Sequence, residues 1–389
     1  MQVSQRLQNI NGGGDDGWAL FERSRAMIAA GIPVIELTQG EHDIPTDPMI
    51  LAAMDEAAQA GHTGYAPIMG IPALRDVVAA RITERTGVLT TRDNIIIEPG
   101  GQAGLYATHH AVLDVGETAL YIDPHYATYP GTIRGVGGVP VAVAARPDAG
   151  FLPDPADISA VAAGAKSLLI NSPNNPTGVV YDQSTLEGIA QVCSDHDLWL
   201  ISDEVYDTQV WNGTHISPRS LPNMGKRTLV IGSMSKSHAM TGSRVGWVCG
   251  PEEMIAHLGD LATNTTYGVP GYIQQAALFG LNAGSDLEER VAAPFRRRRA
   301  LSIAVLEGQN ILRPVPADGA MYMMLDVRGT GLSGEAFGEA LLDAEHIAVM
   351  PGESFGHAAA GHIRIAMTAE DTAYEDALRR IVSFAQSRV

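Results

Sequence analysis

The sequence predicts an α/β fold with two parts. The larger is a domain with a mostly parallel seven-stranded sheet covered by helices, and the smaller is an α+β C-terminal domain. The first observation is that short apolar runs alternate regularly with amphipathic stretches between residues 94 and 249. Nearly continuous apolar strands separated by helices indicate a parallel-dominated sheet buried on both faces. The second is that this alternation stops beyond residue 250, where a final mixture of strands and helices follows.

The spacing of apolar residues and the turn residues on either side predict where each helix and strand lies. The strands of the large sheet are expected at residues 94–98, 118–122, 139–143, 167–170, 198–202, 228–232 and 245–249, with helices between them at 102–113, 126–135, 155–163 and 185–195. Before them we expect helices at 18–30, 47–60 and 72–85 and a strand at 34–37. After them we expect helices at 252–263, 273–281, 286–307, 334–344 and 374–387, and strands at 320–326, 347–349 and 362–367.

These elements divide the chain into three regions. We expect an N-terminal arm that also forms part of the small domain (1–45), a large domain (46–283) and a small C-terminal domain (284–389).

Composition limits the function classes. Among 389 residues, 45% are hydrophobic and 18% charged, as in an ordinary globular protein. The net charge of −18 argues against nucleic acid or an anionic membrane as a partner. Cys193 and Cys249 are too few for a disulfide framework, and their surroundings do not suggest a metal site. Because the first residues lack the apolar core of a signal peptide and no apolar run approaches a membrane span, we expect a cytoplasmic protein.

Four loops at predicted strand ends carry residues that a chain reversal alone does not need. Residues 98–105 are Gly-rich and open a helix, which favours a phosphate cradle. Residues 171–178 form a rigid loop that places an Asn amide beside Pro. Asp203 leaves a buried strand and needs a cationic partner. Lys236 follows a Gly/Ser turn, with Arg244 eight residues later. Such a Lys can act as a nucleophile or base, although a surface Lys is the alternative for this residue taken alone.

Ligands of a parallel sheet gather at the carboxyl ends of its strands, where these four loops fall. Together the loops describe a ligand with a phosphate, a basic ring nitrogen, a ring hydroxyl and an aldehyde that condenses with Lys. Pyridoxal 5′-phosphate meets each demand, and a Lys Schiff base with an Asp on the ring nitrogen is its usual protein setting.

Four motifs carry a resemblance to a known family over nearly the full length of the chain. They are Asn174-Asn175-Pro176-Thr177-Gly178, Asp203-Glu204-Val205-Tyr206, Ser233-Met234-Ser235-Lys236 with Arg244, and Ile363-Arg364-Ile365. With these motifs the chain resembles the fold-type I, pyridoxal phosphate-dependent aminotransferases of class I/II, in the aspartate aminotransferase-like superfamily. The resemblance implies that residues 46–283 form the cofactor-binding domain.

The resemblance also implies a reaction and an assembly. The reaction is transamination between an L-amino acid and a 2-oxo acid by a ping-pong mechanism, in a homodimer with shared active sites. A carbon–sulfur β-lyase or another eliminating enzyme on the same scaffold remains the alternative, because each reaction begins with deprotonation of Cα. A regulator that uses the cofactor as a sensor would carry a DNA-binding domain, for which there is neither spare length nor basic charge.

Roles for the residues around the cofactor ring are implied by the resemblance. Lys236 forms the Schiff base and moves the proton between Cα and the cofactor. Asp203 pairs with the ring nitrogen and keeps it protonated. Tyr206 and Asn175 hydrogen-bond the ring hydroxyl oxygen. Tyr126 stacks on the ring, with an ordinary core Tyr as the alternative.

The remaining implied roles concern the phosphate and the substrate. The phosphate is expected to bind the backbone of Gly101 and Gln102, the hydroxyls of Ser233 and Ser235, Arg244, and Tyr65 of the neighbouring subunit. Arg364 is expected to hold the substrate α-carboxylate, helped by Gly40 and Asn175.

Two positions depart from the family pattern. Where many relatives read Gly-Glu-Pro-Asp, this chain reads Gly40-Glu41-His42-Asp43, so His42 either contacts substrate or faces solvent. Gln102 stands where some aspartate-using relatives place Lys or Thr. Because Gln lacks the positive charge that would favour an acidic side chain, preference for aspartate is weakly supported. The run from Arg296 to Arg299 is expected to be a solvated helix face.

Overall fold

The computed structural model describes residues 1–13 and 18–388. Within them, the larger sheet has seven strands in the order β2-β8-β7-β6-β5-β3-β4. Their bounds are β2 (Ile95–Glu98), β3 (Thr118–Asp123), β4 (Val139–Ala144), β5 (Ala165–Asn171), β6 (Trp199–Asp203), β7 (Thr228–Ser233) and β8 (Gly246–Cys249). Only β8 runs antiparallel to its neighbours in this described sheet, and the other paired strands are parallel. The mostly parallel sheet predicted from the sequence is confirmed.

Helices cover both faces of this sheet. Their bounds are α3 (Pro48–Gln59), α4 (Pro72–Thr86), α5 (Gly101–Val112), α6 (Tyr129–Gly135), α7 (Pro155–Val161), α8 (Gln183–Asp195), α9 (Met234–Ser237), α10 (Glu252–Thr263) and α11 (Gly271–Asn282). In β2, Ile96 packs with residues of α5, α6 and α10, whereas Ile95 and Ile97 pack with residues of α4 and α11. Adjacent side chains of a strand point to opposite faces, so a strand buried on both sides must be apolar throughout.

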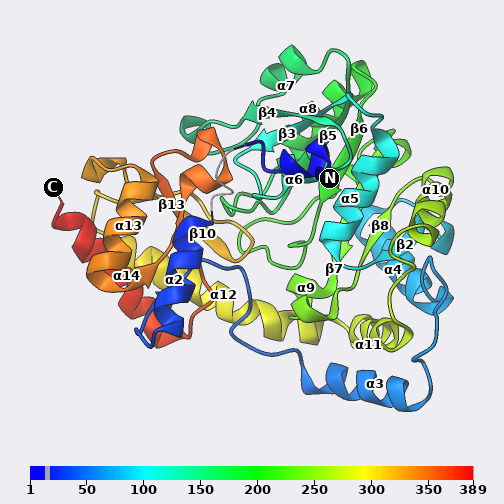
Figure 1. Ribbon diagram of the computed structural model, residues 1–389, viewed down its shortest axis with the longest axis horizontal. Coiled ribbons are helices and arrows are strands. Elements are labelled where there is room, and N and C mark those ends of the chain that lie inside the picture. The colour runs from blue at the N-terminus through cyan, green and yellow to red at the C-terminus, as the bar shows by residue number, and fades with distance from the viewer. Residues whose placement is uncertain (14–17, 389) are drawn as a thin grey trace.

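The second group of elements surrounds a smaller sheet. In the described residues its strands follow the order β12-β13-β10-β9, and β1 pairs with β11 beside it. The bounds are β1 (Ile35–Glu36), β9 (Arg313–Pro314), β10 (Tyr322–Asp326), β11 (Ile347–Ala348), β12 (Met350–Pro351), β13 (His362–Ala366), α2 (Ala19–Ala29), α12 (Ser285–Leu306), α13 (Gly334–Glu345) and α14 (Asp371–Gln386). Figure 1 shows α2 among the C-terminal helices, because the β1–β11 pair draws the N-terminal segment into this group. The domain boundaries at residues 45 and 283 stay a prediction.

Two expected elements differ from the structure. The helix expected at residues 126–135 begins only at Tyr129, with Pro130 in its first turn, where the missing N–H costs nothing. Tyr126 therefore lies in the loop between β3 and α6. The strand expected at 347–349 ends one residue earlier, as β11, and a separate strand, β12, follows and pairs with a different partner.

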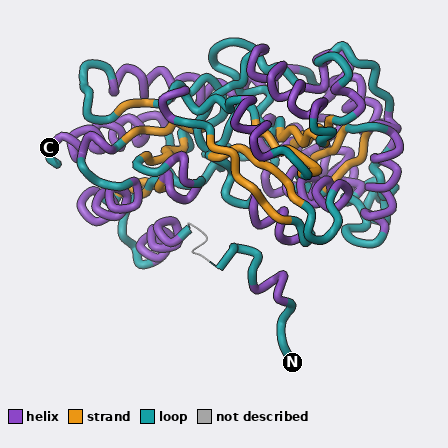
Figure 2. Tube along the Cα trace, turned by 90° about the horizontal axis from the view of Figure 1, so that it is seen from above, coloured by secondary structure: helices purple, strands orange, loops and turns teal. Residues whose placement is uncertain are grey.

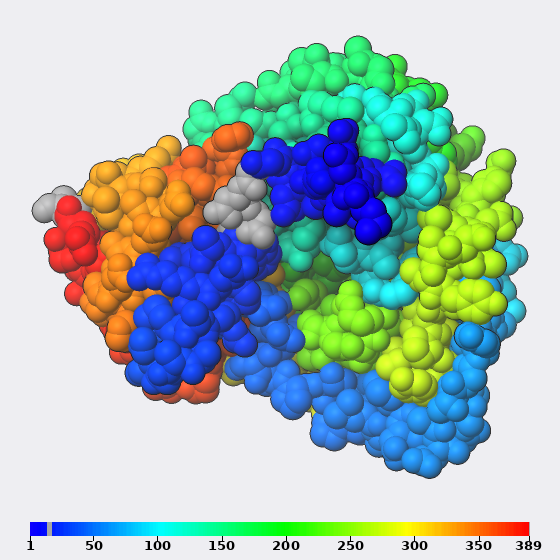
Figure 3. Space-filling view, viewed as in Figure 1, coloured from blue at the N-terminus to red at the C-terminus, as the bar shows by residue number. Residues whose placement is uncertain are grey.

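The N-terminal segment with α1 (Gln5–Gln8) lies on the outside of the molecule. Figure 2 shows its first residues projecting from the body, and Figure 3 shows the segment lying over elements coloured cyan and green. Arg134 of α6 holds it by donating from Nη1 to the carbonyl of Ile10 at 3.1 Å. Within the described chain, helices lack the combination of length and apolar character that crossing a membrane requires.

Candidate active site

A cavity of about 260 Å³ opens at the carboxyl ends of β5, β6 and β7. Parallel pairing sets Asn171 of β5 opposite Asp203 of β6, so the polar ends of these strands meet at one edge. The cavity is lined by the predicted site residues Gly40, Gly101, Gln102, Tyr126, Asn175, Asp203, Tyr206, Ser233, Ser235, Lys236, Arg244 and Arg364. Tyr65 is the predicted residue that does not line it.

Lys236 is presented by α9, the short helix that begins where β7 ends. The Ser233 hydroxyl caps this helix by accepting from the Ser235 amide at 3.1 Å. The Lys236 Nζ donates to the carbonyl of Gly40 at 2.5 Å. Burial lowers the pKa of Lys236, which enlarges the fraction of neutral amine, the nucleophilic form.

Glycine at position 40 leaves room for the side chain of Tyr322. A Cβ atom built on Gly40 would lie 1.7 Å from the hydroxyl oxygen of Tyr322, far closer than two non-bonded atoms can approach. Any side chain at residue 40 would displace Tyr322 from the cavity.

Asp203 is a buried carboxylate at the end of β6. Tyr129 donates its hydroxyl to Oδ2 at 2.7 Å, and the amide of Val205 donates to Oδ1 at 3.3 Å. Burial raises the pKa of Asp203 from 3.8 to about 6, so the group is mostly ionised at neutral pH. Among the described residues its partners are neutral, and it forms no ion pair. A buried charge without a counter-ion is costly, so this position suits a cationic ring nitrogen.

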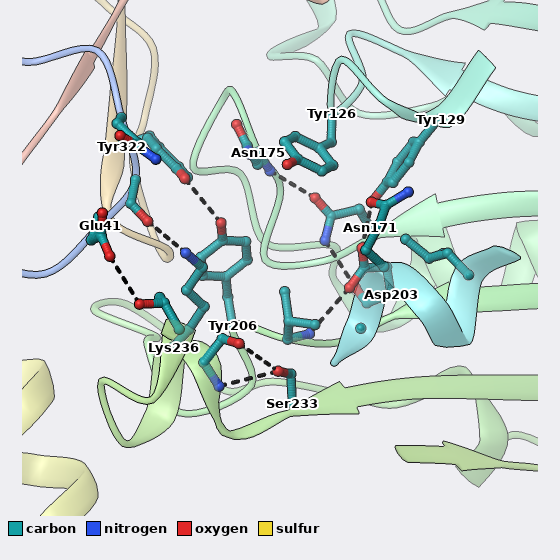
Figure 4. A pocket seen from close by; sticks show the side chains of 18 of the residues that line it. Glu41, Tyr126, Tyr129, Asn171, Asn175, Asp203, Tyr206, Ser233, Lys236 and Tyr322 are labelled. Carbon is teal, nitrogen blue, oxygen red and sulfur yellow. Dashed lines mark hydrogen bonds between the residues drawn. The ribbon is translucent and has the colours of Figure 1, made fainter. Parts of the chain in front are cut away.

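A set of amides and hydroxyls surrounds Asp203 (Figure 4). The Asn171 Nδ2 donates to the carbonyl of Asp203 at 2.9 Å, and the Asn175 amide donates to the Asn171 Oδ1 at 2.7 Å. The hydroxyls of Tyr206 and Tyr322 lie 3.0 Å apart. Tyr206 and Asn175 both line the cavity and bring a hydroxyl and an amide to its wall.

The other end of the cavity gathers groups that suit a phosphate. The hydroxyls of Ser233 and Ser235 are buried and lie 2.9 Å apart. The backbone of α5 begins at Gly101, and the first amides of a helix have no partner within it. Arg244 donates from Nη1 to the carbonyl of Thr241 at 2.8 Å and, within the described chain, pairs with no carboxylate. A Cβ atom on Gly100 would lie 2.5 Å from the Arg244 Nη2, so glycine leaves room for the guanidinium.

Arg364 is a buried cation on β13, with a side chain sandwiched between two rings. Its guanidinium carbon lies 4.4 Å from the ring centroids of Tyr322 and Phe355. Nη1 donates to the Asn175 Oδ1 at 2.9 Å, and Nη2 donates to the carbonyl of Thr38. Nε has no partner, and in the part of the chain described here no carboxylate pairs with Arg364. Such a cation suits a substrate carboxylate, which an Arg side chain binds with two parallel hydrogen bonds.

Several lining residues were not identified as site residues from the sequence. Asn171 ends a predicted strand and Tyr129 lies three residues after Tyr126, so their positions offered a signal. Glu41 adjoins the predicted Gly40, so its position offered a signal too, whereas Tyr322 offered none, because it reaches the cavity from the smaller sheet. Tyr65 is 92% exposed, and its ring packs against that of Tyr267 with centroids 5.2 Å apart.

Comparison with known proteins agrees with this geometry. The family model of aminotransferase class I and II matches residues 32–381. The chain is 39% identical to the arginine–pyruvate transaminase AruH of Pseudomonas aeruginosa, over 98% of this chain and 97% of that protein. It is 35% identical to the aspartate/prephenate aminotransferase of Thermus thermophilus, over 90% of each.

A solved structure agrees as well. The aspartate aminotransferase of Thermus thermophilus with maleate superposes with a TM-score of 0.92 at 32% identity, over 99% of this chain and 100% of that one. The predicted fold and transaminase activity are thus confirmed, whereas the lyase alternative gains no support. The chain belongs to the class I and II aminotransferases, the pyridoxal phosphate-dependent enzymes of fold type I.

Proposed function

We propose that the cavity binds pyridoxal 5′-phosphate and that Lys236 forms the covalent link to it. When bound, this cofactor supplies an electrophilic carbon and a ring that delocalises the electron pair left on the substrate Cα. Asp203 pairs with the ring nitrogen, Tyr206 and Asn175 hydrogen-bond the ring hydroxyl, and Tyr126 stacks on the ring. The uncompensated charge of Asp203 and the lowered pKa of Lys236 support these roles.

The phosphate is held by the amides of Gly101 and Gln102, the hydroxyls of Ser233 and Ser235, and Arg244. Support comes from the arrangement of these donors at one end of the cavity, next to the start of α5. These groups would keep the bound cofactor in place within the cavity that Lys236 also lines.

The substrate is an L-amino acid in one half of the reaction and a 2-oxo acid in the other. The observation that carries this proposal is Arg364, a buried cation with an unpartnered Nε that lines the same cavity as Lys236. A carboxylate held there would orient the substrate Cα toward the Lys236 amine, which would accept and hold the proton removed from Cα. Orientation of this kind lowers the barrier because the reacting atoms meet in a defined geometry.

Arg364→Ala is expected to raise KM for both the amino acid and the 2-oxo acid about 100-fold, since hydrogen bonds to charged groups are worth about 1.5–3 kcal/mol. Steady-state kinetics with both substrates varied, together with cofactor occupancy from visible absorbance, provide the measurement. The cofactor occupancy of the Arg364→Ala variant should equal that of the unmodified protein. Arg328→Ala is the matched control, because Arg328 is exposed and pairs with Asp326 at 2.7 Å.

The same kinetics can contradict the proposal in two ways. Equal loss of cofactor and substrate binding in the Arg364 variant would make this residue a phosphate anchor. Catalytic release of ammonia and a 2-oxo acid from one amino acid alone, with no co-substrate, would favour the eliminating enzyme over transamination.

The side chain of the amino donor is proposed to be neutral or basic. Cations of the described chain that line the cavity are Lys236, Arg244 and Arg364, and each has a role above. The Gln102 amide is held by Thr132, at 2.9 Å from Nε2, and Glu41 adds a carboxylate to the lining. The arginine–pyruvate relative supports this proposal. A higher kcat/KM for aspartate than for arginine, measured with one common 2-oxo acid, would contradict it.

The active enzyme is proposed to be a homodimer in which Tyr65 reaches the phosphate in the neighbouring subunit. Support comes from the nearly full exposure of the Tyr65 side chain on a single chain, an unusual place for a large ring. Sedimentation equilibrium should give twice the mass of one chain, and Tyr65→Phe should weaken cofactor binding about fivefold, as expected for one lost hydrogen bond. A fully active monomer, or unchanged cofactor affinity in Tyr65→Phe, would contradict this arrangement.

A further inference from the structure

His42 lies between the loop that carries Gly40 and the turn that carries Lys236. Its Nε2 is 3.1 Å from the carbonyl oxygen of Lys236. Its ring packs edge-to-face on Phe295 of α12, with centroids 5.3 Å apart. The ring is therefore held against the protein and only partly exposed, and His42 is not among the residues that line the Lys236 cavity.

The direction of this hydrogen bond is defined by its chemistry. A carbonyl oxygen can only accept, so Nε2 must carry the hydrogen. Burial, and then the nearby charge of Lys236, lower the pKa of His42 to about 4. At neutral pH the ring is thus a neutral donor with the proton on Nε2, and Nδ1 has no partner in the described chain.

The Lys236 carbonyl needs such outside partners. The helix α9 has four residues, and the last carbonyls of a helix receive no hydrogen bond from an N–H group of the same helix. A helix this short does not hold its own shape, so contacts from elsewhere must place it. Two side chains supply donors to this carbonyl: His42 from the loop after β1, and Gln209, whose Nε2 also lies at 3.1 Å, from the loop after β6.

The loop of His42 is itself anchored on both sides. Asp43 pairs with Arg298 of α12 at 2.6 Å. Arg298 is only 3% exposed, so the expectation of a solvated helix face for the run from Arg296 to Arg299 is wrong at this residue, which the carboxylates of Asp43 and Asp371 draw inward. Toward the Lys236 turn, Thr46 donates to the carbonyl of Ala239 at 2.6 Å.

We propose that His42 is a positioning residue that holds the main chain of Lys236 and the substrate-binding Gly40 segment as one unit. This inference rests on the proposed role of Lys236 as the reactive amine. Gly40 contacts the tip of the Lys236 side chain, and His42 contacts its base. The Gly40 contact involves Nζ itself and changes whenever that atom reacts, whereas the His42 contact is made with the main chain and can keep the base of the side chain in place. The Nζ atom then stays within reach of the substrate Cα.

The test compares His42→Ala, His42→Asn and His42→Gln, since Gln can place an amide near the position of the His42 Nε2, whereas Asn is shorter. His110→Ala, an exposed histidine of α5, is the matched control. One readout is steady-state kinetics, which shows whether a variant changes kcat or KM. The other is deuterium uptake by the amides of residues 234–241 in the cofactor-free protein, which requires no reaction.

His42→Ala and His42→Asn are expected to lower kcat about tenfold with KM changed less than about twofold, because a small misplacement of a reacting group is costly. Uptake at 234–241 should rise in both, and His42→Gln should restore both readouts toward the unmodified protein. If the Ala variant does not fold, the Asn and Gln pair decides.

Unchanged uptake and kcat in the Ala and Asn variants would overturn the proposal, as would an equal loss in all three variants. Failure of the proposed function has a different signature, because turnover would then survive Lys236→Ala whatever the His42 variants do.

Discussion

Lys236→Ala is expected to abolish steady-state turnover, with a loss of at least about 10⁴-fold, because the variant loses the amine that links the cofactor and transfers the proton. The visible absorbance of the lysine-linked cofactor should disappear with it. The buried position of Lys236, its lowered pKa and its contact with Gly40 give the physical basis for this expectation. Stopped assays of product formation and an absorbance spectrum of the reconstituted protein provide the measurement.

Lys166→Ala is the matched control for this experiment. The Lys166 side chain is 50% exposed and pairs with Glu117 at 3.1 Å, outside the cavity. Its variant should keep both the spectrum and the turnover. Retained turnover in Lys236→Ala would show that another group carries the reaction.

Asp203→Asn is expected to lower turnover by at least about 100-fold while making the cofactor-free protein more stable. The variant keeps an acceptor for the Tyr129 hydroxyl but loses the charge that would hold a protonated ring nitrogen, and one lost electrostatic contact to a reacting group costs about 2.7–4 kcal/mol. The gain in stability follows because an ionised carboxylate no longer has to be buried without a counter-ion.

The stability difference should depend on pH. The folded-state pKa of Asp203, about 6, lies above its ordinary value of 3.8, so the folded protein binds this proton more tightly than the unfolded chain does. The cost of the charge is therefore fully present above pH 6 and vanishes as pH falls toward 3.8. The difference between these two pKa values corresponds to about 3 kcal/mol in the free energy of unfolding.

Denaturant unfolding of the cofactor-free proteins between pH 4 and 8 provides the check. The advantage of Asp203→Asn should be largest at pH 8 and should shrink as pH falls through about 6. An advantage that does not change with pH would mean that the Asp203 charge is compensated in the folded protein.

The parts of the site that the sequence could predict are those that follow directly from a strand end. Asp203 and Lys236 each come after an apolar run, and parallel strands place their carboxyl ends at one edge. The large sheet was predictable for the same reason, since its strands are apolar on both faces. The β8 strand, which runs antiparallel, carries no local sign of its direction.

The rest depends on contacts between distant segments. Tyr322 meets Tyr206 across 116 positions of sequence, and His42 meets Lys236 across 194, so no local pattern links either pair. In the sequence, nothing distinguishes Arg298 from the three arginines next to it. Its burial is explained by its ion pairs with Asp43 and Asp371, which are distant in sequence. Such placements require the relative position of the two sheets, which periodicity does not encode.

A covalent link between Lys236 and the cofactor can be tested directly, because the lysines of the sequence are Lys166, Lys226 and Lys236. The protein loaded with pyridoxal 5′-phosphate can be reduced with borohydride, which makes the link permanent, then digested and mapped by mass spectrometry. We predict the cofactor mass on the peptide that contains Lys236 and on neither of the other two. An adduct on Lys166 or Lys226 alone, or none on any lysine, would contradict the assignment of Lys236 as the cofactor-linked residue.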